Sequence, residues 1–301
     1  MSASLQNIVI IGFGLIGSSI ARAVKEASPN TNITAYDSNH EYLDYAVDND
    51  IADSGYDYPD TYLAEADLVV LCTPVGQMEK IAQSIAQFLT KKNVISDVGS
   101  VKQSVIDHVS AALPYPEMFV PAHPISGAEK SGPSAGFAGL FKDRWAIITP
   151  TEMTDLKAIE SVTALWEICG ANIDFMEPKH HDLVLAITSH LPHLIAYSIV
   201  GTASNLAEDL QREVIKYSAG GFRDFTRIAG SDPTMWRDIF LENKESVLDV
   251  LQRFHEDLSE LQKAIRQDKG DMLQDHFTKT RKIRNAVIDS GQAGRAPYED
   301  K

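Results

Sequence analysis

The sequence has little of what secreted, membrane-spanning or nucleic-acid-binding proteins need. Only two cysteines, Cys72 and Cys169, occur among 301 residues, and both lie in apolar segments, which favours reduced thiols in a cytoplasmic protein over a disulfide framework. Lysine and arginine number 27 against 42 aspartates and glutamates, and the net charge of −15 argues against nucleic acid as a partner. No apolar run approaches the roughly 20 residues of a bilayer-spanning helix, and the start lacks the basic region of a signal peptide. We therefore expect neither nucleic acid nor a membrane as a partner.

The composition that remains is that of a globular protein with room for two domains. Apolar residues make up 44% of the chain and charged residues 23%. Short apolar strand-like runs alternate with helical segments and stop near Glu177. This pattern predicts an α/β fold, with a doubly wound, mostly parallel sheet over residues 1–176 and an all-helical domain over residues 177–301. The expected strands are residues 7–11, 32–36, 67–73, 93–97, 145–149 and 172–176.

A glycine-rich turn follows the first expected strand. The segment Gly12-Phe13-Gly14-Leu15-Ile16-Gly17 has the GxGxxG spacing of dinucleotide-binding turns, and a helix follows it. Its three glycines allow a tight turn, close approach of the backbone to a pyrophosphate, and close packing of helix on strand. The free N–H groups at the helix start then face the phosphates. The turn, including Leu15 and Ile16, is a predicted cofactor site.

An acidic residue identifies the expected cofactor. Asp37 ends the second expected strand, 20 positions beyond Gly17, where its carboxylate can accept a hydrogen bond from a ribose 2′-hydroxyl. A 2′-phosphate would be repelled there, so the sequence predicts NAD rather than NADP. Thr73 and Pro74 follow the third expected strand and are predicted to face the same cofactor. The alternative is a plain glycine turn beside an ordinary surface aspartate.

Two further loops carry candidate catalytic residues. Ser100 lies in the turn DVGSVK after the strand 93–97, on the side of the sheet where ligands gather, although a serine there can also cap a helix. His123 lies in PAHPISGAEKSGP, where proline and glycine prevent a helix and no amphipathic face calls for an imidazole. We interpret His123 as the centre of the active site.

The helical half contributes further polar candidates and an expected interface. Residues 179–206 form an apolar helical stretch, interrupted near Pro192, that needs a second subunit to cover it, which predicts an obligate homodimer. His190 and His193 are three residues apart on this stretch and are predicted substrate contacts. A metal site, with Asp182 as a further ligand, and buried structural histidines are the alternatives; the HExxH pattern is absent.

One arginine is suited to bind an anionic group of the substrate. Arg227 lies in the segment GGFRDFTR, and a guanidinium is suited to bidentate recognition of a carboxylate. The alternative is an ion pair between Arg227 and Asp224, three residues away.

Together these motifs resemble the prephenate dehydrogenase family, including its arogenate (cyclohexadienyl) dehydrogenases. The matching segments are GFGLIG, DVGSVK, HPISGAEKSGP, HHDLVLAITSHLPH and GGFRDFTRIAGSDPTMWRDIF, and they cover nearly the whole chain. The resemblance implies a Rossmann-type domain followed by a helical dimerisation domain. It also implies NAD-dependent oxidative decarboxylation of prephenate to 4-hydroxyphenylpyruvate, or of arogenate to tyrosine, in tyrosine biosynthesis.

The resemblance also implies roles for individual residues. His123 is the catalytic group near the ring hydroxyl of the substrate, and Ser100 forms a hydrogen bond in the same cluster. His193 and Arg227 contact the substrate, and Glu129 lies close to the gate of the active site. The choice between prephenate and arogenate, and inhibition by tyrosine, stay open.

Two other functions are compatible with parts of this pattern. A β-hydroxyacid dehydrogenase would depend on a catalytic lysine in the helical domain, and no lysine there stands out. A non-enzymatic NAD sensor on the same fold would have little need of Ser100, His123, His193 and Arg227 together.

Overall fold

The computed structural model describes residues 5–127, 131–204, 213, 216–217 and 220–289. The chain divides into two compact units, residues 1–247 and 248–301. The first contains the sheets and the helices through α10, and the second contains most of α11 (Lys244–Arg266) and all of α12 (Gly270–Asp289). The predicted domain boundary at residues 176 and 177 stays a prediction.

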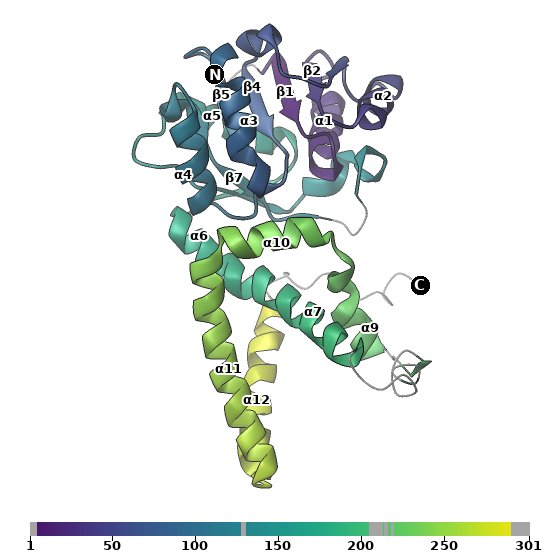
Figure 1. Ribbon diagram of the computed structural model, residues 1–301, viewed down its shortest axis with the longest axis vertical. Coiled ribbons are helices and arrows are strands. Elements are labelled where there is room, and N and C mark those ends of the chain that lie inside the picture. The colour runs from purple at the N-terminus through teal and green to yellow at the C-terminus, as the bar shows by residue number, and fades with distance from the viewer. Residues whose placement is uncertain (1–4, 128–130, 205–212, 214–215, 218–219, 290–301) are drawn as a thin grey trace. The chain divides into compact units, whose positions relative to one another are not determined.

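The main sheet has six parallel strands in the order β3-β2-β1-β4-β5-β6 (Figure 1). The side chains of β1 alternate between two cores: Ile8 and Ile10 belong to one, and Val9 and Ile11 to the other. Helices α1 and α5 contribute to the first core, and α3 and α4 to the second. A parallel sheet must be covered in this way on both faces, which explains its continuous apolar strands. The bounds are β1 (Asn7–Ile11), β2 (Asn32–Tyr36), β3 (Ser54–Tyr56), β4 (Leu68–Leu71), β5 (Val94–Asp97), β6 (Phe119–Val120), α1 (Leu15–Ala27), α2 (His40–Asp48), α3 (Met78–Ile85), α4 (Gln103–Ala112) and α5 (Leu156–Ile168).

A second, three-stranded sheet carries the central histidine. Its order is β7 (Ala122–Pro124), β8 (Trp145–Ile148) and β9 (Asn172–Phe175), with β7 antiparallel to β8 and β8 parallel to β9. The prediction that His123 lies in a loop is wrong, because His123 pairs with Ile147. Proline can end β7 since this strand lies at the sheet edge and pairs on one side only.

The helical part of the first unit runs through Pro192 without a break. Helix α6 (Pro178–Leu185) continues as a π-helical turn (Ala186–His190) and then as α7 (Leu191–Ser204), so the predicted interruption is wrong. Proline lacks an N–H and its ring crowds the carbonyl four residues earlier, and the wider turn just before Pro192 relieves that clash. The chain continues with α9 (Gly220–Thr226), a 3-10 helix (Arg227–Gly230) and α10 (Pro233–Glu242), which the Asp232 side chain caps by accepting from Met235 N at 2.8 Å.

The continuous helix also changes one expectation from the sequence. Residues Pro178–Ser204 form a helix of 27 residues with a mean hydropathy of 1.6, long and apolar enough to cross a membrane by length and composition. The statement that no apolar run reaches this length is therefore wrong, because the helix joins the apolar segments on both sides of Pro192. Only 22% of its most apolar window is buried. An exposed apolar helix of this length also occurs where a second subunit covers it.

Candidate active site

The glycine turn between β1 and α1 has the shape that its spacing predicts. Gly12 has a φ of +94°, and a Cβ on it would lie 2.7 Å from the backbone of Cys72. A Cβ on Gly17 would lie 2.3 Å from the carbonyl oxygen of Gly12, so both positions require glycine. A Cβ on Gly14 would meet nothing within 4 Å. Gly14 therefore leaves space beside the N-terminus of α1, which begins with Leu15 and Ile16, where a pyrophosphate can approach.

The other predicted cofactor residues lie at the same end of the sheet. The Asp37 carboxylate accepts hydrogen bonds from Phe13 N at 2.7 Å and Asn39 N at 2.9 Å, which holds it against the glycine turn. The Thr73 backbone nitrogen would lie 2.9 Å from a Cβ on Gly12, and Pro74 follows it. Among the described residues, the buried Thr73 Oγ1 has no hydrogen-bond partner, so it is available to a bound nucleotide. These features fit a dinucleotide.

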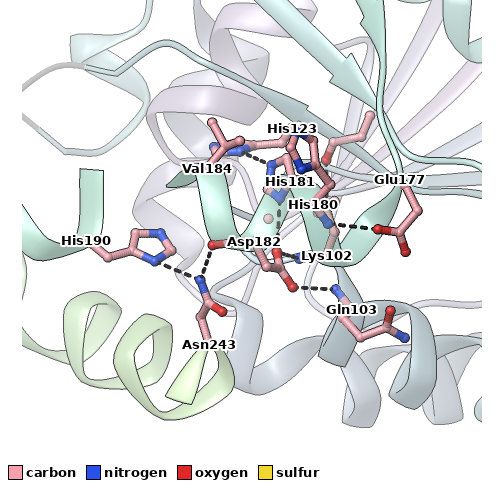
Figure 2. A network of polar contacts seen from close by, with 12 residues as sticks. Lys102, Gln103, His123, Glu177, His180, His181, Asp182, Val184, His190 and Asn243 are labelled. Atoms are coloured by element: carbon pink, nitrogen blue, oxygen red, sulfur yellow. Dashed lines mark hydrogen bonds and ion pairs between the residues drawn. The ribbon is translucent and has the colours of Figure 1, made fainter. Parts of the chain in front are cut away.

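His123 ends a chain of hydrogen-bonded side chains that links β7 to α6 and α4 (Figure 2). Its side chain is 8% exposed, and its Nδ1 lies 2.9 Å from Nε2 of His181. Nδ1 of His181 lies 2.9 Å from Oδ1 of Asp182. The Asp182 carboxylate accepts hydrogen bonds from the backbone N–H groups of Lys102 at 2.7 Å and Gln103 at 2.9 Å. Nε2 is therefore the nitrogen of His123 that is left for a substrate.

A buried ion pair fixes the strand that carries His123. The fully buried Lys102 ammonium contacts the Asp97 carboxylate and donates to the Ala122 carbonyl at 2.7 Å. Asp97 in turn accepts from Ala122 N at 3.2 Å, so the pair ties β7 to the end of β5. Burial raises the pKa of Asp97 and lowers the pKa of Lys102, and the attraction between the two opposes both shifts. Ser100 lies half-buried in the same turn, two residues before Lys102.

The surroundings keep His123 neutral. Burial lowers its pKa well below the usual value of 6.5, and electrostatic interactions with the His181, Lys102 and His190 side chains lower it further. Burial also lowers the pKa of His181, although the hydrogen bond to Asp182 opposes that shift. At neutral pH, His123 is therefore an uncharged imidazole with a free lone pair.

The predicted substrate contacts in the helical part include His190, which adjoins the same network at the end of the π-helical turn. His190 is fully buried, and its Nδ1 lies 3.1 Å from Nδ2 of Asn243, which also donates to the Asp182 carbonyl at 2.8 Å. His193 stacks on Trp236 with ring centroids 3.7 Å apart. Burial and the positive charge of Arg227 lower the pKa of His193, whereas its hydrogen bond with the Ser189 carbonyl, at 2.8 Å, opposes that shift.

The remaining candidates from the sequence are Glu129 and the alternative of a metal site with Asp182. Glu129 lies outside the described residues. No group of three or more His, Cys, Asp or Glu side chains suited to a metal ion occurs within the described part of the chain. Asp182, considered from the sequence only as a metal ligand, instead bonds His181 and the start of α4. The roles of His181 and Asn243 could not be predicted from the sequence, since nothing in the local spacing shows that His181 meets a residue 58 positions away.

Comparison with known proteins identifies the family. Residues 20–175 match the nucleotide-binding domain of prephenate dehydrogenase, and residues 177–279 match its dimerization domain. This chain belongs to the prephenate dehydrogenase family. The family and the fold class predicted from the sequence are therefore confirmed.

Individual members of the prephenate dehydrogenase family align with almost the full length of this chain. A cyclohexadienyl dehydrogenase of Zymomonas mobilis is 44% identical over 94% of this chain and 96% of its own length. A prephenate dehydrogenase of Bacillus subtilis is 34% identical over 95% of this chain and 77% of its own length. The crystal structure of the Aquifex aeolicus prephenate dehydrogenase with hydroxyphenyl propionate and NAD+ superposes with a TM-score of 0.88 and 35% identity, covering 95% of this chain and 100% of that one.

The site contains residues from both domains of the prephenate dehydrogenase family. Asp37, Ser100 and His123 lie in the range of the nucleotide-binding model, whereas Asp182 and His193 lie in that of the dimerization model. All of them belong to the first compact unit.

Proposed function

We propose that this protein catalyses the NAD-dependent oxidative decarboxylation of prephenate to 4-hydroxyphenylpyruvate, or of arogenate to tyrosine, in tyrosine biosynthesis. One observation carries the proposal: a neutral, buried imidazole, His123, is held through Nδ1 and leaves Nε2 to accept a proton. Membership of the prephenate dehydrogenase family supports the substrate class.

The residues around the glycine turn fit NAD. Gly12, Gly14 and Gly17 would form the turn against the pyrophosphate with the N–H groups near Leu15 and Ile16. Asp37 would bind the ribose hydroxyls, and Thr73 and Pro74 would line the opposite side. When bound, NAD+ supplies the hydride acceptor for oxidation of an alcohol.

His123 is proposed to accept the proton of the reacting alcohol as a general base. As the ring carbon that bears the hydroxyl is oxidised, the hydroxyl proton passes to Nε2 of His123, which stabilises the developing carbonyl. Such general-base assistance contributes about 10²–10⁴ in rate. Loss of the ring carboxylate as CO2 then leaves an aromatic ring, which makes the reaction effectively irreversible. Ser100 is proposed to form a hydrogen bond to the same hydroxyl.

The remaining predicted residues are assigned to substrate binding. Arg227 is proposed to hold a substrate carboxylate by charge-assisted hydrogen bonds, next to His193 and with His190 and Glu129 contributing to the site. A local cation is needed because the net charge of −15 repels an anionic substrate at long range.

The protein is proposed to act as a homodimer. The segment 177–279 matches a dimerization domain. Its helix α7 exposes the apolar side chains Ile199 and Val200, and the preceding π-helical turn exposes Ile187. Exposed apolar surface of this kind marks an interface between subunits.

A direct assay tests the proposed reaction. Purified protein is given NAD+ or NADP+ with prephenate or arogenate, with and without tyrosine, and formation of reduced cofactor is followed together with the aromatic product. We expect turnover with NAD+ and at least one of the two substrates, and its loss in His123→Asn. Binding of NAD+ without turnover of either substrate would instead support a sensor, and turnover of a β-hydroxyacid alone would support that other class of dehydrogenase.

A further inference from the structure

We propose that Asp182 and His181 are positioning residues that set the tautomer of His123, so that its proton lies on Nδ1 and its Nε2 presents a lone pair to the substrate. The consequence for catalysis rests on the function proposed above. The tautomer itself is a property of the folded protein that can be measured without turnover.

Two backbone N–H groups fix the hydrogen-bond role of Asp182. Oδ1 accepts from Lys102 N–H at 2.7 Å and Oδ2 accepts from Gln103 N–H at 2.9 Å. A backbone N–H can only donate, so both carboxylate oxygens are acceptors. Lys102 is the N-cap residue of α4 and Gln103 is its first residue, so the positive end of the helix dipole also favours a negative charge there. Both oxygens of the Asp182 side chain therefore act as hydrogen-bond acceptors in this network.

The proton position then follows along the chain of contacts. Because Asp182 only accepts, His181 must donate from Nδ1 across the 2.9 Å contact. A neutral imidazole carries one proton, so Nε2 of His181 is an acceptor. Its partner at 2.9 Å is Nδ1 of His123, which must therefore carry the proton. In the neutral ring of His123, Nε2 is then bare.

The inference requires His181 to stay neutral, since an imidazolium would donate from both nitrogens and force the proton of His123 onto Nε2. His181 is fully buried, and burial lowers its pKa. The nearby charge of Lys102 lowers that pKa further, whereas the carboxylates of Asp182 and Asp97 oppose the shift. Burial of the whole network therefore favours the arrangement in which His123 can act as a base.

A matched pair of variants tests the role of His181. His181→Leu removes the acceptor that faces Nδ1 of His123, whereas His181→Gln keeps a carboxamide oxygen that can accept the same hydrogen bond. The full-length protein is labelled with ¹⁵N-histidine and saturated with NAD+. The His123 signals are assigned from the spectrum of His123→Asn, and the protonated nitrogen is identified by its chemical shift.

We expect wild-type His123 to be protonated on Nδ1 and bare on Nε2. In His181→Leu, a substantial share of His123 should carry the proton on Nε2, and kcat should fall by about 10²-fold or more with KM changed little. In His181→Gln, the wild-type tautomer should return and kcat should lie within about tenfold of wild type.

Several outcomes would overturn the inference. One is a wild-type His123 that carries its proton on Nε2, whatever the activity. Another is a His181→Leu variant that keeps both the tautomer and kcat. If His181→Leu does not fold, the wild-type spectrum and His181→Gln decide: loss of the Nδ1–H tautomer in a folded His181→Gln protein counts against the inference. A wild-type protein with the expected tautomer but no turnover of prephenate or arogenate would contradict the proposed function and leave the tautomer assignment standing.

Discussion

At the scale of single residues, His123 shows how position gives a common side chain a special role. An exposed histidine is partly charged at neutral pH, whereas burial and the nearby Lys102 ammonium hold the pKa of His123 well below 6.5. Its Nδ1 is occupied by His181, so only Nε2 can take part in chemistry.

Replacing this base should affect chemistry rather than binding. We expect His123→Asn to lower kcat by about 10²–10⁴-fold with little change in KM, because asparagine cannot accept the proton but occupies similar space. Arg227→Ala serves as the contrast and should chiefly raise KM. Steady-state kinetics with the opposite pattern in the two variants would reverse the assignment of their roles.

The buried histidines should also make stability depend on pH. Burial lowers the pKa of His190 to about 4 from 6.5, so the unfolded chain binds the proton more readily than the folded protein does. The neutral form of His190 therefore adds about 3 kcal/mol to the free energy of unfolding above pH 6.5. This contribution is lost as the pH falls toward 4. His123, His181 and His193 shift in the same direction.

Urea denaturation between pH 7 and pH 4 measures this effect on the free energy of unfolding. His190→Asn keeps a polar atom for Asn243 but cannot be protonated, so its stability should fall less steeply with decreasing pH. Equal slopes for the variant and the wild type would show that His190 does not titrate in this range.

At the scale of elements, different glycines of the turn between β1 and α1 serve folding and cofactor binding. Gly17 is required by its contact with the Gly12 carbonyl, whereas Gly14, with a φ of −76° and open space around its Cα, is required by nothing in the described chain. The second glycine of the motif is thus left for the cofactor.

Two alanine variants make this distinction measurable. Gly17→Ala should lower the free energy of unfolding by about 1–3 kcal/mol, because backbone atoms cannot move away from the new Cβ. Gly14→Ala should leave stability within about 0.5 kcal/mol of wild type yet weaken NAD+ binding by about tenfold or more. Thermal unfolding without cofactor and calorimetric titration with NAD+ provide the two measurements, and unchanged affinity in Gly14→Ala would argue against pyrophosphate binding there.

At the scale of the whole molecule, the apolar helix α7 predicts the oligomeric state. Ile199 is 36% exposed and has apolar residues next to it along the chain. Val47 on α2 is 41% exposed, and polar residues follow it along the chain. An interface through α7 would bury the first side chain and leave the second in water.

We therefore expect the wild-type protein to be a homodimer by size-exclusion chromatography with light scattering. Ile199→Asp should shift it toward a monomer or reduce its solubility, because a charge would be buried without a partner. Val47→Asp, the control of similar exposure, should stay dimeric. A wild-type monomer would contradict the proposed interface.

Local patterns in the sequence determined much of this protein. The apolar runs that became β1, β2, β4 and β5 and the glycine turn could be predicted, because each depends on residues close together in the chain. The cap of α10 is local as well, because Asp232 accepts from the N–H of Met235, three residues later.

Only the tertiary structure decided how the site is assembled. The short strand of His123 forms because β8 lies beside it, and the helix through Pro192 persists because a π-helical turn makes room for the ring. Asp182 meets Lys102 across 80 positions and His181 meets His123 across 58. Hydrogen bonds between segments so far apart depend on how sheets and helices pack, and packing leaves no periodic trace in the sequence.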